Sequence, residues 1–301
     1  MAHHKSNRPP NHHGKGKPPR RKPSNHQRAE SKHPQIEINL QNPGGKLYEQ
    51  KELSLALQVH ARTLETDIES RLSHSDISVP RADIPDLTLK SDIAELANTW
   101  LPLLDKALFF DLVRRGMREH DQIVIYAEED DLEGFCSVLD EGTFISLNMQ
   151  HATSGRHRSF TQTMLGTLAH EMLHAFFHLY SCDTCSHCKK RQGARKGGDG
   201  HSGHGPNWCN AMVKVQKAIQ HQVAWNVNTS TAASVALEMR TSGWVPRDDQ
   251  IQRWELTSVD LHAMARNMEP VNSRWIEQID TEETEETEDD MPQLVCLCTL
   301  M

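Results

Sequence analysis

Two histidines and a glutamate in the middle of the chain have the spacing of a metal-dependent hydrolytic site. In the segment HEMLH, residues 170–174, the histidines are four positions apart. On a helix they would lie on one face, about 6 Å apart along the axis, and their nitrogens could converge on one Zn²⁺ at about 2.1 Å. Glu171 is placed instead to reach a metal-bound water and take its proton. The motif predicts metal-assisted hydrolysis, with His170 and His174 as ligands and Glu171 as the general base.

The motif lies in a stretch that is expected to form a largely buried helix, from about residue 158 to Tyr180. Apolar residues recur there at three- and four-residue steps, which is the pattern of a buried helical stripe. They are Met164, Leu165, Leu168, Met172, Leu173, Phe176 and Phe177. The alternative is a surface helix whose histidines are incidental, and the apolar surroundings argue against it.

A catalytic zinc site needs a third protein ligand and leaves its fourth position for water. His178 continues the four-residue series, but on a regular helix it would lie about 12 Å from His170, too far for the same metal. The longer pattern HExxHxxGxxH also fails, because Phe177 stands at its glycine and Tyr180 at its last histidine. The third ligand must therefore come from farther along the chain.

The best candidate for this ligand is His204, in the segment GHGPNW at residues 203–208. An amphipathic helix is predicted from residue 206 to about 223, and His204 comes just before it. The glycine and proline that follow restrict the backbone at this corner, so that the imidazole can be aimed well. His201, in a glycine-rich stretch, is the alternative.

Together, LAHEMLHAF at residues 168–176 and GHGPNW downstream resemble the SprT-like metalloprotease family, whose member Spartan degrades proteins crosslinked to DNA. TFISLN, residues 143–148, is similar to the strand that precedes the metal helix in such proteins. The resemblance covers about residues 95–223. It implies an α+β fold with a mainly helical, zincin-like metalloprotease core and a small antiparallel sheet. It also implies the site residues assigned above, namely the ligands His170, His174 and His204 and the base Glu171.

Elements before the metal helix are expected to support it. A helical segment is predicted at 46–72, and a second helix at 91–116, which Pro102 should kink or split. Strands are predicted by composition at 123–126, 135–139 and 143–149, the last two as a hairpin.

Three closely spaced cysteines follow the metal helix and suggest a second metal site. They are Cys182, Cys185 and Cys188. A structural zinc would need one more ligand, for which His187, His201 and Cys209 are candidates, and we group Cys209 with the three cysteines as the possible second zinc site. The alternative is a group of reduced thiols in a loop. The expected cofactor is thus one catalytic Zn²⁺, with a second, structural zinc left open.

The two ends of the chain differ from its middle in composition. The first 35 residues or so are rich in Pro, Lys, Arg and His, and residues 281–290 are the acidic run TEETEETEDD. Neither can bury enough apolar surface to offset chain entropy, so both ends are predicted to be disordered. The expected divisions are a basic tail at 1–45, a helical segment at 46–90, a SprT-like metalloprotease core at 91–224, a C-terminal helical segment of unknown role at 225–277 and an acidic tail at 278–301.

Charge and cysteine content bear on the compartment and partners. The chain starts without a secretory signal, and its seven cysteines do not suggest a disulfide framework, so we expect the nucleus or the cytoplasm. The net charge of −8 is unevenly distributed, because the N-terminal tail is basic and the C-terminal tail is acidic. The basic N-terminal tail, with RRK at residues 20–22, could contact DNA, act as a nuclear import signal, or pair loosely with the acidic tail.

The last four residues, Cys298 to Met301, match the C-a-a-X pattern for prenylation, and Cys296 could carry a palmitoyl group. The acidic residues upstream argue against such an anchor. A membrane is therefore expected as a partner only if Cys298 is prenylated.

These features predict a zinc-dependent peptidase that hydrolyses protein substrates through a zinc-bound water activated by Glu171. The resemblance extends this expectation to DNA-bound or DNA-crosslinked proteins. One alternative is a non-catalytic SprT-like zinc scaffold that binds DNA or protein partners, and another is a zinc hydrolase with a non-peptide substrate. Glu171 argues against the scaffold, because a purely structural site needs no base.

Overall fold

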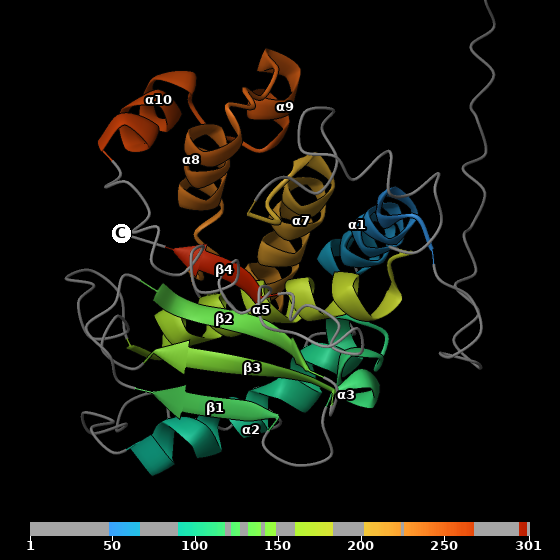
Figure 1. Ribbon diagram of the computed structural model, residues 1–301. Coiled ribbons are helices and arrows are strands. Elements are labelled where there is room, and N and C mark those ends of the chain that lie inside the picture. The colour runs from blue at the N-terminus through green and yellow to red at the C-terminus, as the bar shows by residue number, and fades with distance from the viewer. Residues whose placement is uncertain are drawn as a thin grey trace, which may run out of the picture. The chain divides into compact units, whose positions relative to one another are not determined.

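A computed structural model of the chain shows a mainly helical α+β architecture (Figure 1). The structure describes residues 48–66, 90–117, 122–126, 132–139, 142–148, 160–182, 202–223, 226–267 and 295–299. All of them belong to the unit Ile36–Met301. The α+β class expected from the sequence is confirmed.

Helix α5, Phe160–Tyr180, is the element around which the others pack. It contacts strands β2 and β3 of the sheet and helices α1, α2, α3 and α7. The other helices are α1 Gln50–Thr66, α2 Lys90–Leu108, α3 Val113–Gly116, α7 Pro206–Val223, α8 Thr231–Ser242, α9 Asp248–Arg253 and α10 Ser258–Asn267. The apolar stripe predicted for α5 is buried, from Met164 to Phe177, because the helix is covered by these elements on several sides. Among the helices that the structure describes, none has the length and apolarity that crossing a membrane requires.

The sheet has four strands in the order β1-β3-β2-β4, and it is mixed. The strands are β1 Ile123–Tyr126, β2 Leu132–Leu139, β3 Gly142–Asn148 and β4 Val295–Thr299. Strands β2 and β3 form the predicted antiparallel hairpin, but β1 pairs with β3 in parallel. The expected antiparallel sheet is therefore wrong for β1. Strand composition identifies a strand but not its neighbour, and here β3 lies between the two strands that precede it in the chain.

The C-terminal region differs from expectation in one segment. Residues Val295–Thr299, which we placed in a disordered acidic tail, form β4 and pair antiparallel with β2. The sequence VCLCT suits a strand, and β2 has an edge that β3 leaves unpaired, so β4 satisfies backbone groups there. The acidic run and the predicted basic tail at 1–45 lie outside the described residues.

Helix α2 continues through Pro102, where a kink or a split was expected, and ends at Leu108. The break comes instead at Phe110 and Asp111, whose φ angles of 61° and 58° are left-handed. Proline removes one helical hydrogen bond, but the helix around it is anchored by buried apolar side chains that include Trp100, 2% exposed. Tertiary packing therefore decides where this helix ends.

A buried carboxyl group starts the short helix after this break. The oxygens of Asp105 accept the backbone N–H groups of Val113 at 2.9 Å and Arg114 at 3.0 Å. Asp105 has no exposed surface, and this burial raises the pKa of its carboxyl group, while the backbone hydrogen bonds act in the opposite direction. The side chain acts as a cap that joins α2 to α3.

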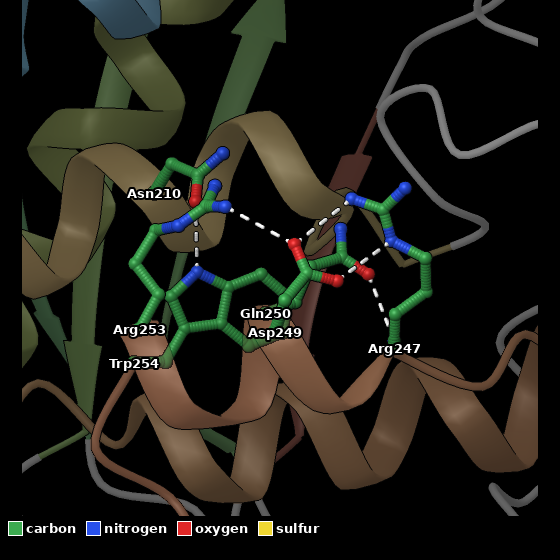
Figure 2. Close-up of polar contacts among 6 residues, drawn as sticks. All are labelled: Asn210, Arg247, Asp249, Gln250, Arg253 and Trp254. Carbon is green, nitrogen blue, oxygen red and sulfur yellow. Dashed lines mark hydrogen bonds and ion pairs between the residues drawn. The ribbon is translucent and has the colours of Figure 1, made fainter. Parts of the chain in front are cut away.

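The C-terminal helices are tied to α7, the helix that follows His204. The indole N–H of Trp254 at the end of α9 donates to Asn210 Oδ1 on α7 at 2.9 Å (Figure 2). Beside this contact, Asp249 pairs with Arg247 and Arg253 at 3.0 and 3.2 Å, and Gln250 Oε1 accepts the backbone N–H of Arg247. Trp254 is buried and the ion pairs are exposed, so the tryptophan is the stronger attachment.

Candidate metal centre

Three histidine side chains meet at one point between α5 and the start of α7. His170 and His174 come from α5, and His204 comes from the corner before α7. The Nε2 atom of His170 lies 3.0 Å from that of His204 and 3.1 Å from that of His174, and the last pair is 3.1 Å apart. All three residues are at most 3% exposed. Among the residues that the structure describes, these three form the one group of potential ligands close enough together to bind a metal ion.

In two of the imidazoles, the hydrogen-bond partner of Nδ1 determines which ring nitrogen carries the hydrogen and which has a free lone pair. His170 Nδ1 lies 2.9 Å from the backbone carbonyl oxygen of Thr229, which only accepts, so this Nδ1 carries the hydrogen. His204 Nδ1 lies 2.9 Å from the hydroxyl oxygen of Ser202, which itself donates to Glu238 Oε2 at 2.8 Å. His204 Nδ1 must therefore donate as well. In the neutral rings both Nε2 atoms then present lone pairs to the centre, only 3.0 Å apart, and a cation between them would remove the repulsion.

Trp208 packs against all three imidazoles and is itself fully buried. Its ring centroid is 4.6 Å from that of His170, 5.3 Å from that of His174 and 4.7 Å from that of His204. The contact with His174 is stacked, with an interplanar angle of 22°. In the sequence, Trp208 is the aromatic residue at the end of the GHGPNW segment, and no role was assigned to its side chain. In the structure it limits how far the ligand rings can rotate.

A glycine inside α5 allows the chain near Thr229 to approach the helix. A Cβ atom at Gly166 would lie 2.0 Å from the backbone oxygen of Asn228, which no side chain can tolerate. Gly166 is one turn before His170, so this close approach places the Thr229 carbonyl beside the imidazole. The signal in the sequence is a glycine within a strongly helical segment.

Glu171 lies between the two helical ligands in the sequence and is 1% exposed. It is not a member of the ligand cluster, whose ligand atoms all lie within 4.8 Å of one another. His178, farther along α5, is also outside this cluster, as the helical geometry predicts. The role of Glu171 as a general base stays a prediction at this point.

The structure gives Cys209 a supporting role beside the third histidine. Its thiol donates to the backbone oxygen of His204 at 3.2 Å. Burial first, and then the charge of Glu238, raise the pKa of this thiol well above its ordinary value, which keeps it protonated.

The other cysteine positions leave the second zinc a prediction. Cys182 follows α5, and its backbone N–H donates to the Tyr48 carbonyl at 2.9 Å. Cys185, Cys188 and the alternative ligands His187 and His201 lie outside the described residues. Cys298 is in β4, opposite Gly134, but its side chain is outside the described part.

Sequence reasoning missed the residues that hold the ligands from outside. Thr229 and Glu238 belong to the segment 225–277, to which we could assign no role. Glu238 has no exposed surface, and its neighbours Leu237 and Met239 on α8 are apolar and buried. An isolated acid within such a helix was a usable signal, because a buried carboxyl group needs partners. The backbone carbonyl of Thr229 leaves no trace in the sequence.

Comparisons with family models, curated proteins and solved structures found no match to this chain.

Proposed function

We propose that this chain is a zinc-dependent peptidase with a SprT-like, zincin-like core that hydrolyses protein substrates. The observation that carries the proposal is the convergence of three buried imidazole Nε2 atoms, of His170, His174 and His204, at separations of 3.0 to 3.1 Å. An acid, Glu171, lies within the same buried helix. This combination of residues matches the requirements of metal-assisted hydrolysis.

Zinc is the ion that suits these ligands best. Imidazole nitrogens bind Zn²⁺ at about 2.0–2.1 Å, which puts two ligands of a tetrahedral site roughly 3.3–3.4 Å apart. The observed separations are slightly shorter, so a small adjustment of the rings would admit the ion. Bound there, Zn²⁺ would polarise a scissile carbonyl and lower the pKa of water to about 7.

The chain's own residues would then divide the remaining work. The three histidines would hold the ion as neutral ligands through their Nε2 atoms. The Nδ1–H groups of His170 and His204 already donate to other groups, which fixes these two rings. Glu171 accepts the proton of the attacking water and passes it to the leaving amine nitrogen. Trp208 keeps water away from the imidazole faces that it covers.

The non-catalytic scaffold is the second candidate, and the number of ligands argues against it. Structural zinc sites are closed by four protein ligands, whereas catalytic sites use three. The cluster in the described part of the chain has three members. Three ligands among the described residues fit a catalytic site, and Glu171, a buried acid that a structural site does not need, supports the same choice.

DNA-bound or DNA-crosslinked proteins are the substrate class that we propose for this peptidase. The support is the SprT-like motif at residues 168–176 and the basic composition of the N-terminal tail. Cleavage of a protein substrate should therefore rise when single-stranded DNA is added. Cleavage that is insensitive to DNA would leave a peptidase with a different substrate class.

The decisive experiment tests the role of the base and the role of a metal ligand in separate variants. We expect Glu171→Gln to retain zinc, measured by metal analysis of the purified protein, and to lose cleavage by a factor of at least about 10³. His204→Ala should lose both the zinc and the activity. Glu255→Gln, a change at an exposed glutamate, is the matched control and should alter neither. Peptidase activity that survives Glu171→Gln would refute the role of the base.

A further inference from the structure

The C-terminal segment contacts the metal centre on two sides. The Thr229 carbonyl engages His170, and Glu238 on α8 reaches His204 through Ser202. The segment 225–277, to which the sequence assigned no role, therefore supplies hydrogen-bond partners that support two of the three ligands. The second of these contacts uses side chains, so it can be tested by substitution.

We propose that Glu238 is a positioning residue for the third metal ligand, acting through the hydroxyl group of Ser202. This inference rests on the proposed metal centre. The geometry forms a continuous relay in which His204 Nδ1 donates to Ser202 Oγ at 2.9 Å and that hydroxyl donates to Glu238 Oε2 at 2.8 Å. The backbone N–H of Ser202 donates to the same Oε2 at 2.8 Å, so one carboxyl oxygen fixes both the hydroxyl and the chain that carries it.

His204 needs such support more than the other two ligands do. His170 and His174 are held by the regular backbone of α5, whereas His204 lies before the first residue of α7. The adjacent Gly203 has a left-handed φ of 81°, which few other residues adopt readily. Without the relay, the imidazole could turn about its side-chain bonds or move its hydrogen to Nε2, and either change would remove a lone pair from the centre.

The burial of Glu238 supports a positioning role for this residue. The residue has no exposed surface, and the residues directly before and after it, Leu237 and Met239, are apolar and buried. A buried carboxyl group lowers stability unless hydrogen bonds compensate, and an apolar residue at this position would avoid that cost. Two donors that compensate it, the N–H and O–H groups of Ser202, lie two residues from the ligand.

The test measures metal affinity, and it does not require activity. Zinc affinity of the full chain is determined by competition with a chromophoric chelator, and the site is also filled with Co²⁺ to record its visible spectrum. We expect Glu238→Ala and Ser202→Ala each to weaken zinc binding about 10–100-fold and to change the Co²⁺ spectrum. Ser202→Thr, which keeps the hydroxyl group, should restore most of the affinity.

The matched control is Asp105→Asn, which changes a different buried carboxyl group. Asp105 accepts two backbone N–H groups at the start of α3. The substitution should lower the stability of the fold but leave zinc affinity within about twofold of the wild type. If Glu238→Ala does not fold, the pair Ser202→Ala and Ser202→Thr decides the matter alone. Unchanged zinc affinity and spectrum in a folded Ser202→Ala chain would overturn the relay.

Failure of the relay and failure of the peptidase give different results. If the wild type binds zinc and the two alanine variants bind it equally well, the relay is wrong and the metal centre stands. If the alanine variants weaken binding but the wild type cleaves no protein, the relay stands and the peptidase proposal falls. A wild-type chain that binds no zinc overturns both.

Discussion

The two parts of the metal centre are held in place by different means. The helical half, His170 and His174, is positioned by the periodicity of α5, whose apolar face is buried against the sheet and the neighbouring helices. The corner half, residues 202–205 with His204, lies outside regular structure and depends on contacts from Glu238, Cys209 and Trp208. A local pattern specifies the first half, while the second half also depends on Glu238, which is distant in the chain.

This contrast suggests how the two halves should respond to change. Helical geometry is maintained by many hydrogen bonds and apolar contacts, so no single outer contact should be essential to the helical half. The corner half has few contacts, and each should matter more. The following substitutions, compared with Glu238→Ala and Ser202→Ala at the corner half, test this difference, beginning with one that acts on both halves.

Trp208→Ala should have the largest effect, because this side chain contacts all three imidazoles. We expect a loss of about 3–5 kcal/mol in the free energy of unfolding, measured with urea, and weaker zinc binding. Trp254→Ala is the matched control, since Trp254 is also buried but contacts Asn210 and not the imidazoles. It should lower stability without changing zinc affinity. Equal losses of zinc affinity in the two variants would mean that Trp208 acts only through general packing.

Gly166→Ala should come next and should test how the helical half depends on the C-terminal segment. The added Cβ would meet the Asn228 oxygen at 2.0 Å, so the chain carrying Thr229 must move away from His170. Alanine favours the helix by about 1 kcal/mol, but the overlap should outweigh this and give a net loss of about 2 kcal/mol. Urea unfolding of the metal-free and zinc-bound chain would measure it.

Gly243→Ala supplies the control for that substitution. Gly243 has a left-handed φ of 68° and no atom within 4 Å of the added Cβ, so its replacement introduces only backbone strain, about 1 kcal/mol. Only Gly166→Ala should also weaken zinc binding. If it left zinc affinity intact, the Thr229 contact would be dispensable for His170.

Asp105→Asn should have the smallest effect on the metal centre, because it concerns a buried carboxyl group outside that centre. An amide can accept only one of the two N–H groups well, so we expect a loss of about 1–2 kcal/mol near neutral pH.

The pH dependence of stability provides a second measurement of Asp105. Burial raises the pKa of this carboxyl group in the folded chain, so the folded chain binds its proton more readily than the unfolded chain does. The stabilising contribution is complete at pH below the ordinary aspartate pKa and is lost as the pH rises through the raised value. Asparagine should abolish this component in urea unfolding of the metal-free chain. An unchanged pH profile would contradict the assigned cause.

The sequence was most informative where function depends on short-range spacing. Two histidines four residues apart must share a helical face, and a glycine and a proline restrict the corner after His204, so all three ligands could be named. The elements around them were recognisable for the same reason, since periods of 3.6 and 2 residues are local properties. The strand order β1-β3-β2-β4 was not recognisable, because pairing depends on which edges meet in space.

Residue types and spacing by themselves indicated the three histidines of the candidate metal centre and the helix that carries two of them, and the family resemblance indicated the α+β class. Only the tertiary structure decided that Thr229, Ser202 and Glu238 hold those ligands from outside, and that Cys209 supports the corner as a protonated thiol. The physical reason is that an imidazole's lone pair is directed by whatever its other nitrogen touches. For His170 that partner is Thr229, and for His204 it is Ser202 held by Glu238; Thr229 and Glu238 both come from a distant segment, which no local pattern records.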